Sequence, residues 1–139
     1  MSEYSLENLS GIELLSDLGP DHLKKVENSC SFKYCKAQEQ IIEQQSETTD
    51  VYFVINGNVR VANYSISGRI ISFADLRAGS YFGELSALDS QPRSASILAL
   101  TNCLLAVFPQ GQFLSLLEEH SSIALKVMKT LARIVRTST

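Results

Sequence analysis

The chain has 139 residues, a net charge of −3, 45% hydrophobic and 19% charged residues, a composition typical of one soluble globular domain rather than of a disordered chain. It contains no apolar run of the roughly 18 residues needed to cross a bilayer, and its polar, acidic N-terminus lacks the pattern of a secretory signal. The acidic balance argues against a nucleic-acid interface of the usual basic kind.

Residues 1–28 are predicted to form an N-terminal helical segment. Leu14 and Leu18 lie on one face of a helical pattern. Gly19 interrupts this pattern, and Pro20 is a favourable first residue for a second helix. The segment therefore predicts two short helices before the strands begin.

From residue 29 to residue 109 the sequence alternates as β-strands do, in short runs separated by turn residues. The dipeptide Asn56-Gly57 stands between two such runs and predicts a type I′ hairpin, because both residues tolerate positive φ angles. Further turns are predicted at residues 65–68 and 78–79. Short strands at regular spacing predict a mainly β fold of the sandwich, barrel or jelly-roll class, flanked by helices.

The three cysteines, Cys30, Cys35 and Cys103, stand in apolar surroundings. Their odd number favours reduced thiols packed as small core residues, and hence a reducing, cytoplasmic compartment. An iron–sulfur or zinc site would need about four ligands at close spacing, so we expect no metal.

Residues 110–139 are predicted to form a C-terminal pair of helices, the second beginning near Ser121. Spacings of four and three define a heptad-like seam in the second helix, made of Ala124, Met128, Leu131, Val135 and Ser138. A second apolar face holds Ile123, Val127 and Ile134. Two interpretations remain open: one broad stripe that docks on the β-domain, or a docking face plus a seam that meets a partner. Because no Gly or Pro ends the pattern, we expect the last helix to be truncated.

Residues 81–96, "YFGELSALDSQPRSAS", carry the functional signal. Gly83 permits a close backbone turn, and free amides at the start of a short helical turn attract an anion. Arg93 has a donor fork that suits phosphate, and Ser94 adds a hydroxyl. Glu84, which only accepts hydrogen bonds when ionised, suits sugar hydroxyls. The stretch predicts a sugar-phosphate pocket; the alternative is a surface ion pair between Glu84 and Arg93.

The residues "FGEL" at 82–85 and "PRSA" at 92–95 closely resemble the phosphate-binding cassette of the cyclic-nucleotide-binding domain family, here residues 79–96. The resemblance implies a β-roll (a double-stranded β-helix of jelly-roll type) that binds cAMP or cGMP. Glu84 would accept from the ribose 2′-hydroxyl, and Arg93 would pair with the cyclic phosphate. By the same resemblance, ligand-binding residues are expected at Gly83, Glu84, Leu85, Ser86, Arg93, Ser94 and Ala95, with Ile71 and Phe73 as apolar walls.

Among subfamilies, the chain is most similar to the sensor domain of bacterial catabolite-activator and FNR-type transcription regulators. This resemblance implies a homodimer through the seam residues Ala124, Met128, Leu131 and Val135, and purine contacts from Ser138 and Thr139. The helix would relay ligand binding to a C-terminal helix-turn-helix domain that binds DNA, which this sequence does not contain. Ser94 could serve either purine; we favour cAMP over cGMP, because no base-reading donor is visible in the sequence.

The sequence departs from the family pattern in two places. The run "QQSETTD" at 44–50 has no glycine where the family usually has one, so this turn must be built differently, away from the expected phosphate contacts. FNR itself carries an N-terminal cysteine cluster, which Cys30 and Cys35 do not reproduce. An oxygen-sensing role is therefore not expected.

Other functions are also compatible with parts of this pattern. The same cassette occurs in cation channels and other signalling proteins, and some regulators of this fold bind another ligand or none. A jelly-roll enzyme of the cupin kind would need two or three histidines in the barrel. The chain has only His22 and His120, both in predicted helices, so we expect it not to be an enzyme.

Overall fold

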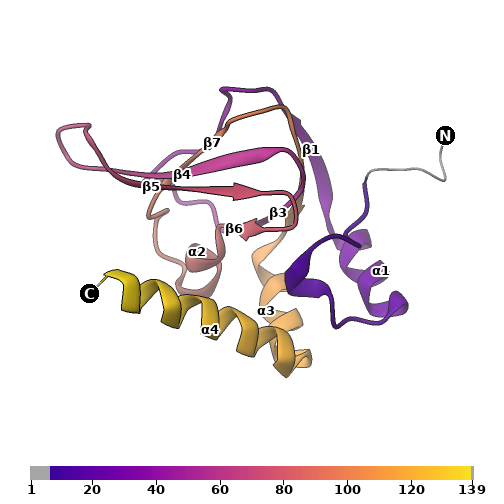
Figure 1. Ribbon diagram of the computed structural model, residues 1–139. Helices are drawn as coiled ribbons and strands as arrows, with labels where there is room; N and C mark the ends of the chain where they lie inside the picture. Colours follow the sequence, from indigo (N-terminus) through magenta and orange to yellow (C-terminus); the bar gives the residue numbers. More distant parts are fainter. Residues whose placement is uncertain (1–6, 139) are drawn as a thin grey trace.

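Two four-stranded antiparallel sheets form the centre of the structure (Figure 1). The computed structural model describes residues 7–138. Its strands are β1 (Ser31–Cys35), β2 (Gln40–Ile42), β3 (Val51–Asn56), β4 (Asn58–Tyr64), β5 (Ile70–Arg77), β6 (Tyr81–Phe82), β7 (Ser96–Ala99) and β8 (Cys103–Phe108). One sheet has the order β1-β8-β3-β6 and the other the order β2-β7-β4-β5. The predicted β-roll with flanking helices is confirmed.

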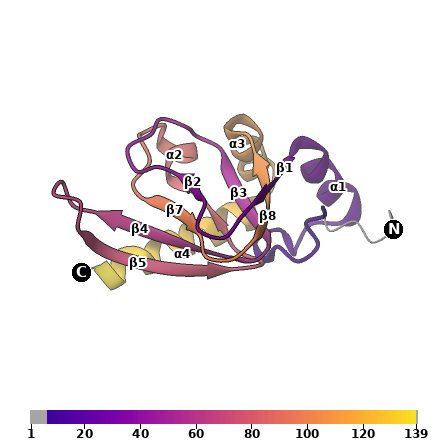
Figure 2. The ribbon, with the colours of Figure 1, turned by 90° about the horizontal axis from the view of Figure 1, so that it is seen from above.

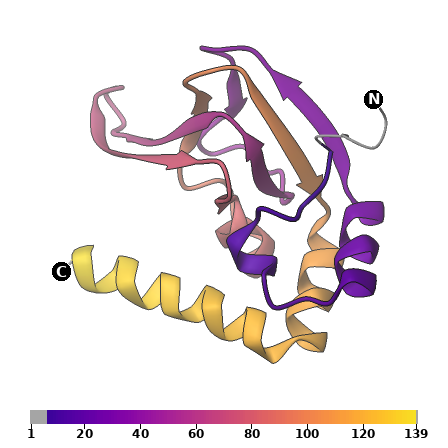
Figure 3. The same ribbon diagram turned by 45° about the vertical axis from the view of Figure 1, so that its right-hand side comes forward.

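Helices lie before, within and after the roll. A 3-10 turn at Glu13–Leu15 and α1 (Pro20–Ser29) precede it, and α2 (Glu84–Asp89) connects β6 to β7. The C-terminal pair is α3 (Gln110–Glu119) and α4 (Ser121–Ser138), and α4 runs beneath the roll past α2 (Figure 3). Within residues 7–138 no helix has the length and apolar character needed to cross a membrane.

The core consists of two clusters that meet at β3. Val54 and Leu105 pack between the two sheets with Val59. Phe53 and Phe113 belong to a second cluster, which fills the space between the first sheet and the helices. Successive side chains of a strand point to opposite faces, so β3 is buried on both sides and joins the clusters.

The predicted hairpin at Asn56-Gly57 is wrong. β3 pairs with β6 and β8, whereas β4 pairs with β5 and β7, so the chain passes at Gly57 from one sheet to the other. Gly57 has a φ of +91°, and a Cβ there would collide with the Asn102 carbonyl and stand 2.8 Å from the Cys103 sulfur. The residue types that allow a tight hairpin also allow this crossing, which local sequence does not distinguish.

The second predicted turn does join a hairpin. β4 and β5 pair along their length, and the amide of Ser65 donates to the Arg69 carbonyl across the turn. Figure 2 shows the tip of this hairpin extending to the same side of the molecule as the C-terminus. The hairpin and α4 therefore lie on the same side of the roll.

The cysteines behave as core residues in two of three cases. Cys35 and Cys103 are buried between the sheets, and Cys30 is half-buried next to the helical cluster. All three are free thiols. Burial raises the pKa of Cys30 to about 12 and that of Cys35 to about 11, so both remain protonated and unreactive near neutral pH.

Candidate functional site

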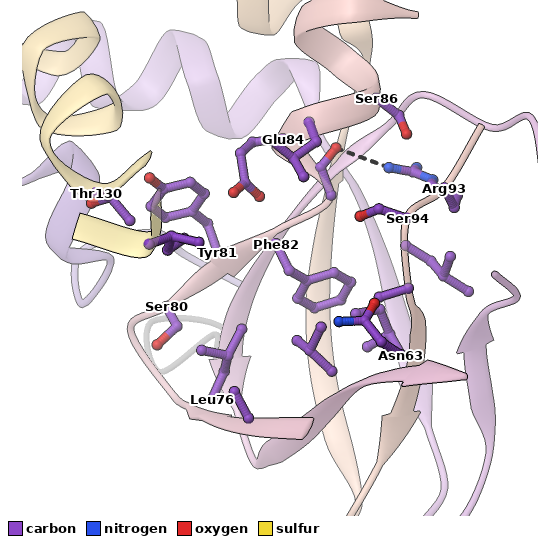
Figure 4. Close-up of a pocket in the computed structure, with 18 of the residues that line it drawn as sticks. Asn63, Leu76, Ser80, Tyr81, Phe82, Glu84, Ser86, Arg93, Ser94 and Thr130 are labelled. Carbon is purple, nitrogen blue, oxygen red and sulfur yellow. Dashed lines mark hydrogen bonds between the residues drawn. The ribbon is translucent and has the colours of Figure 1, made fainter. Parts of the chain in front are cut away.

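A cavity of about 720 Å³ lies between the roll and α4 (Figure 4). The β4–β5 hairpin forms one wall, the segment from β6 to β7 a second, and α4 a third. Side chains that line it include Val61, Asn63, Ser72, Ala74, Leu76, Tyr81, Glu84, Arg93, Ser94, Thr130, Arg133 and Thr137. A space of this size accommodates a small organic ligand.

Gly83 shapes the backbone at the start of α2. Its φ is +87°, and a Cβ there would lie 2.8 Å from the Asp50 carbonyl oxygen and 2.9 Å from Nη1 of Arg93. Only glycine fits this left-handed position without displacing its neighbours. Gly83 therefore brings its carbonyl against Arg93 and places Glu84 at the first turn of α2.

Arg93 is 3% exposed although it is a cation. Its Nε donates to Oγ1 of Thr48 at 3.0 Å, Nη1 to the Gly83 carbonyl at 2.8 Å, and Nη2 to the Asp50 carbonyl at 2.7 Å. These acceptors are all neutral, and no carboxylate forms an ion pair with Arg93 in the described part of the chain. Burial lowers the pKa of the guanidinium, which still remains charged at neutral pH. A buried cation without an anionic partner is costly, so the site suits an anionic ligand.

The turn at residues 44–50 contributes directly to the position of Arg93. Besides the Thr48 contact, the amide of Arg93 donates to the Ser46 carbonyl, and the amide of Gln45 donates to the Arg93 carbonyl. Gln45 has a φ of +75° at this turn, a conformation that usually favours glycine. The turn was expected to lie away from the expected phosphate contacts, but it bonds directly to Arg93, so this expectation is wrong.

Glu84 faces the same cavity from α2 (Figure 4). Burial raises the pKa of its carboxyl group, while its own backbone amide and Arg93 act in the opposite direction. The described residues contain no ion pair between Glu84 and Arg93. The alternative of a surface ion pair is wrong, because Arg93 is buried and bonded to other groups.

The structure brings the other expected cassette residues to this cavity. Gly83, Leu85, Ser86, Ser94 and Ala95 all line it. Ser86 and Ala95 are buried, whereas Leu85 and Ser94 are exposed toward it. Their contacts with a ligand remain predictions.

Ile71 and Phe73 do not form walls of the cavity, contrary to expectation. They are 67% and 58% exposed, and Phe73 packs beneath the guanidinium of Arg60, 4.4 Å from its ring centroid. The alternate residues of β5, Ser72 and Ala74, face the cavity instead. Side chains alternate across a strand, so Ser72 and Ala74 point to the cavity while Ile71 and Phe73 point away from it.

The expected purine contacts lie at the end of the described chain. Thr139 is outside the described residues, and the side chain of Ser138 is likewise not described. Thr137 does line the cavity, and its hydroxyl donates to the Ile134 carbonyl of its own helix at 2.9 Å. The roles of Ser138 and Thr139 stay predictions.

A polar stripe that α4 turns toward the cavity was not among the predicted site residues. Thr130, Arg133 and Thr137 line it at helical spacings of three and four. The hydroxyl of Tyr81 is buried, and Figure 4 shows Tyr81 beside Thr130. The spacing of the stripe was visible in the sequence, but nothing there indicated which face of α4 meets the cavity.

The two apolar faces of α4 have different surroundings. Ile123 and Val127 are buried in the helical cluster, as a docking face requires. Among the seam residues, Met128 and Val135 are exposed, and Ala124 and Leu131 are half-buried. Leu131 also packs against the helical cluster, so only Met128 and Val135 form an exposed part of the seam. Ile134, predicted to belong to the docking face, is 50% exposed and lines the cavity instead.

Comparisons with known proteins show relatives in sequence and in fold. The family model "Cyclic nucleotide-binding domain" matches residues 32–120. The lysophospholipase nte1 of Aspergillus oryzae is 29% identical over 133 residues, which cover 96% of this chain and 9% of that protein. The Thermus thermophilus Catabolite Activator Protein superposes with a TM-score of 0.80 at 26% identity, over 90% of this chain and 59% of that chain. The regulatory domain of Toxoplasma gondii PKA with cAMP gives a TM-score of 0.79 at 23% identity, over 94% and 49%, which shows the common fold.

Proposed function

Because the chain belongs to the cyclic nucleotide-binding domain family, we propose that its 720 Å³ cavity binds cAMP and that α4 relays the binding event. One observation carries the proposal. In the described part of the chain, the buried guanidinium of Arg93 has no carboxylate partner. The half-buried carboxylate of Glu84 faces the same cavity without pairing with it. Such a pair complements a ligand that has an anionic group near hydroxyl groups.

Six cassette residues have a proposed role. The free N–H groups of Arg93 and the hydroxyl of Ser94 bind the cyclic phosphate, helped by the amides of Gly83, Leu85 and Ala95. Glu84 accepts a hydrogen bond from the ribose 2′-hydroxyl. Three of the five N–H groups of Arg93 bond to the protein, so two remain for the ligand.

The relay follows from the two sides of α4. Thr130 and Arg133 line the cavity, whereas Met128 and Val135 are exposed on the seam. A ligand that contacts α4 better in one position than in another shifts the helix and its seam together. We propose that the seam forms a homodimer or contacts a further domain.

Two longer proteins could carry this module. The chain spans about a tenth of the curated relatives it matches, whose printed name is lysophospholipase, and 59% of the Thermus activator. In the first case the module regulates an enzyme domain elsewhere in the chain; in the second it regulates a DNA-binding domain. The downstream coding sequence distinguishes them directly.

The roll itself is proposed to be a binding module rather than an enzyme. The rings of His22 and His120 pack edge to face, with centroids 4.9 Å apart, and neither residue is among those that line the cavity. In residues 7–138 no three His, Cys, Asp or Glu side chains are grouped to hold a metal ion. The side chains of the cavity wall supply charged and hydrogen-bonding groups that can bind a ligand.

Calorimetric titration tests the proposal. We expect cAMP to bind once per chain and adenosine, which lacks the phosphate, to bind far more weakly. The same ligands are compared in thermal unfolding, where a bound ligand raises Tm. Absence of saturable binding by both cAMP and cGMP contradicts the proposal.

A further inference from the structure

Two polar residues interrupt an apolar wall of the cavity. Asn63 of β4 and Ser72 of β5 are direct cross-strand partners, and Nδ2 of Asn63 donates to Oγ of Ser72 at 3.1 Å. Both side chains line the cavity. Their apolar neighbours on this wall include Val61, Ala74, Leu76 and Ile97. An amide and a hydroxyl thus stand together where the inner face of the roll is otherwise apolar.

The contact between them leaves most of their hydrogen-bonding capacity unused. In the described structure, neither side chain forms another hydrogen bond. The Asn63 amide keeps its carbonyl oxygen and one N–H, and Ser72 keeps its hydroxyl proton. The position of the pair therefore provides an acceptor and donors side by side, facing a cavity.

We propose that Asn63 and Ser72 read the edge of the purine base and favour adenine, an inference that rests on the proposed cyclic nucleotide function. Arg93 and Glu84 hold the phosphate and ribose on the α2 side of the cavity, so the base extends along the β4–β5 wall. Figure 4 shows Asn63 on that wall, away from Glu84. The base-reading donor that the sequence did not reveal is thus supplied by β4.

The chemistry of the pair fits adenine better than guanine on the edge that carries the 6-substituent and N7. Adenine offers an amino donor beside the N7 acceptor, and an asparagine amide complements both. Guanine offers two acceptors there, so the Asn63 oxygen would face the guanine O6. On the opposite wall, the Thr137 hydroxyl is already bonded to its own helix.

The test is a cycle of protein and ligand variants measured by calorimetry. The probes are cAMP, cGMP and the cyclic monophosphate of purine riboside, which lacks the 6-amino group. We expect the wild type to prefer cAMP over the last probe by roughly 5- to 100-fold. Asn63→Leu, which keeps the volume and suits the apolar wall, should reduce this preference to about twofold or less, and Ser72→Ala should reduce it partially.

A control variant shows whether the effect is specific to the pair, and two results would overturn the inference. Ser67→Ala, in the exposed turn of the same hairpin and outside the cavity lining, should keep the wild-type preference. If Asn63→Leu keeps the preference, or Ser67→Ala removes it, the pair does not read the base. If the folded wild type binds none of the three probes, the proposed function fails as well. Because Ser72→Ala removes a single oxygen, it keeps the test decisive if Asn63→Leu is poorly folded.

Discussion

Two walls of the cavity differ in how firmly the fold holds them. The segment from β6 to β7 is tied to the body of the roll, because Arg93 is buried and bonded to the Gly83 and Asp50 carbonyls. The C-terminal half of α4 also lines the cavity, yet Ile134 and Val135 are 50% and 61% exposed. The first wall is preorganised, whereas the second has little packing to hold it in one place.

The difference between the two walls indicates which of them can move when a ligand binds. A preorganised wall gives affinity without a large ordering cost. A weakly packed wall can respond, because contacts with a ligand are large relative to those that it already makes. The first half of α4 is anchored through Ile123 and Val127, so motion is expected only beyond this anchor.

The largest expected effect comes from replacing Arg93, the cation of the preorganised wall between β6 and β7. Arg93→Lys should weaken cAMP binding by about 2–5 kcal/mol, roughly 30- to 4,000-fold, because an ammonium cannot hold three protein acceptors and a phosphate together. Arg133→Lys, on the exposed α4 wall, is the matched control and should change binding by less than about threefold. Calorimetry measures both, with urea unfolding to show that each variant folds. Equal losses would mean that the two walls are equivalent.

A smaller effect is expected at Glu84, and it depends on the ligand. Glu84→Gln should weaken cAMP binding by about 1–1.5 kcal/mol, the difference between a charge-assisted hydrogen bond and a neutral one. The same substitution should leave binding of 2′-deoxy-cAMP nearly unchanged, since that ligand lacks the hydroxyl. A similar loss for both ligands would place Glu84 away from the ribose.

The same variant has an effect on stability that changes with pH. Burial raises the pKa of Glu84 in the folded state above its usual value of 4.5. The stabilisation that this shift represents is present below the unfolded pKa and is lost as the pH rises through the folded pKa. At pH 7 unliganded Glu84→Gln should therefore unfold at higher urea concentration than the wild type, and the difference should shrink as the pH falls toward 4.5.

The sequence largely predicted the wall between β6 and β7, whereas it did not predict the wall formed by the β4–β5 hairpin. Glycine, carboxylate, guanidinium and hydroxyl within residues 83–94 form a rare combination, and its spacing predicts a short helix after a turn. β5 offers no such signal, because the larger residues Ile71 and Phe73 look like the buried ones. They lie outside because the inner side of this strand borders a cavity.

Two further differences between the predictions and the structure, at Thr48 and Gly57, arise from long-range contacts. Thr48 bonds Arg93 across 45 positions of sequence, so no local pattern shows that this turn completes the site. Gly57 permits both a hairpin and a crossing between sheets, and the choice depends on pairing with β8. Local chemistry predicts element types well, whereas sheet membership depends on the whole chain.

The smallest expected effect concerns the anchor of α4 itself. Nζ of Lys126 lies 3.1 Å from a carboxylate oxygen of Asp17 and 3.2 Å from Oγ of Ser16, which ties the first half of the helix to the N-terminal segment. Both charged side chains are partly exposed, so Lys126→Met should cost only about 0.2–1 kcal/mol of unfolding free energy. Hydrogen exchange should nevertheless show faster opening in the first half of α4, as the movable part extends toward α3. Lys129→Met, an exposed lysine one turn away, is the control and should leave the exchange pattern unchanged. In the wild type, cAMP should slow exchange mainly beyond Val127; uniform slowing along α4 would mean that the helix responds as one rigid body and has no anchored half.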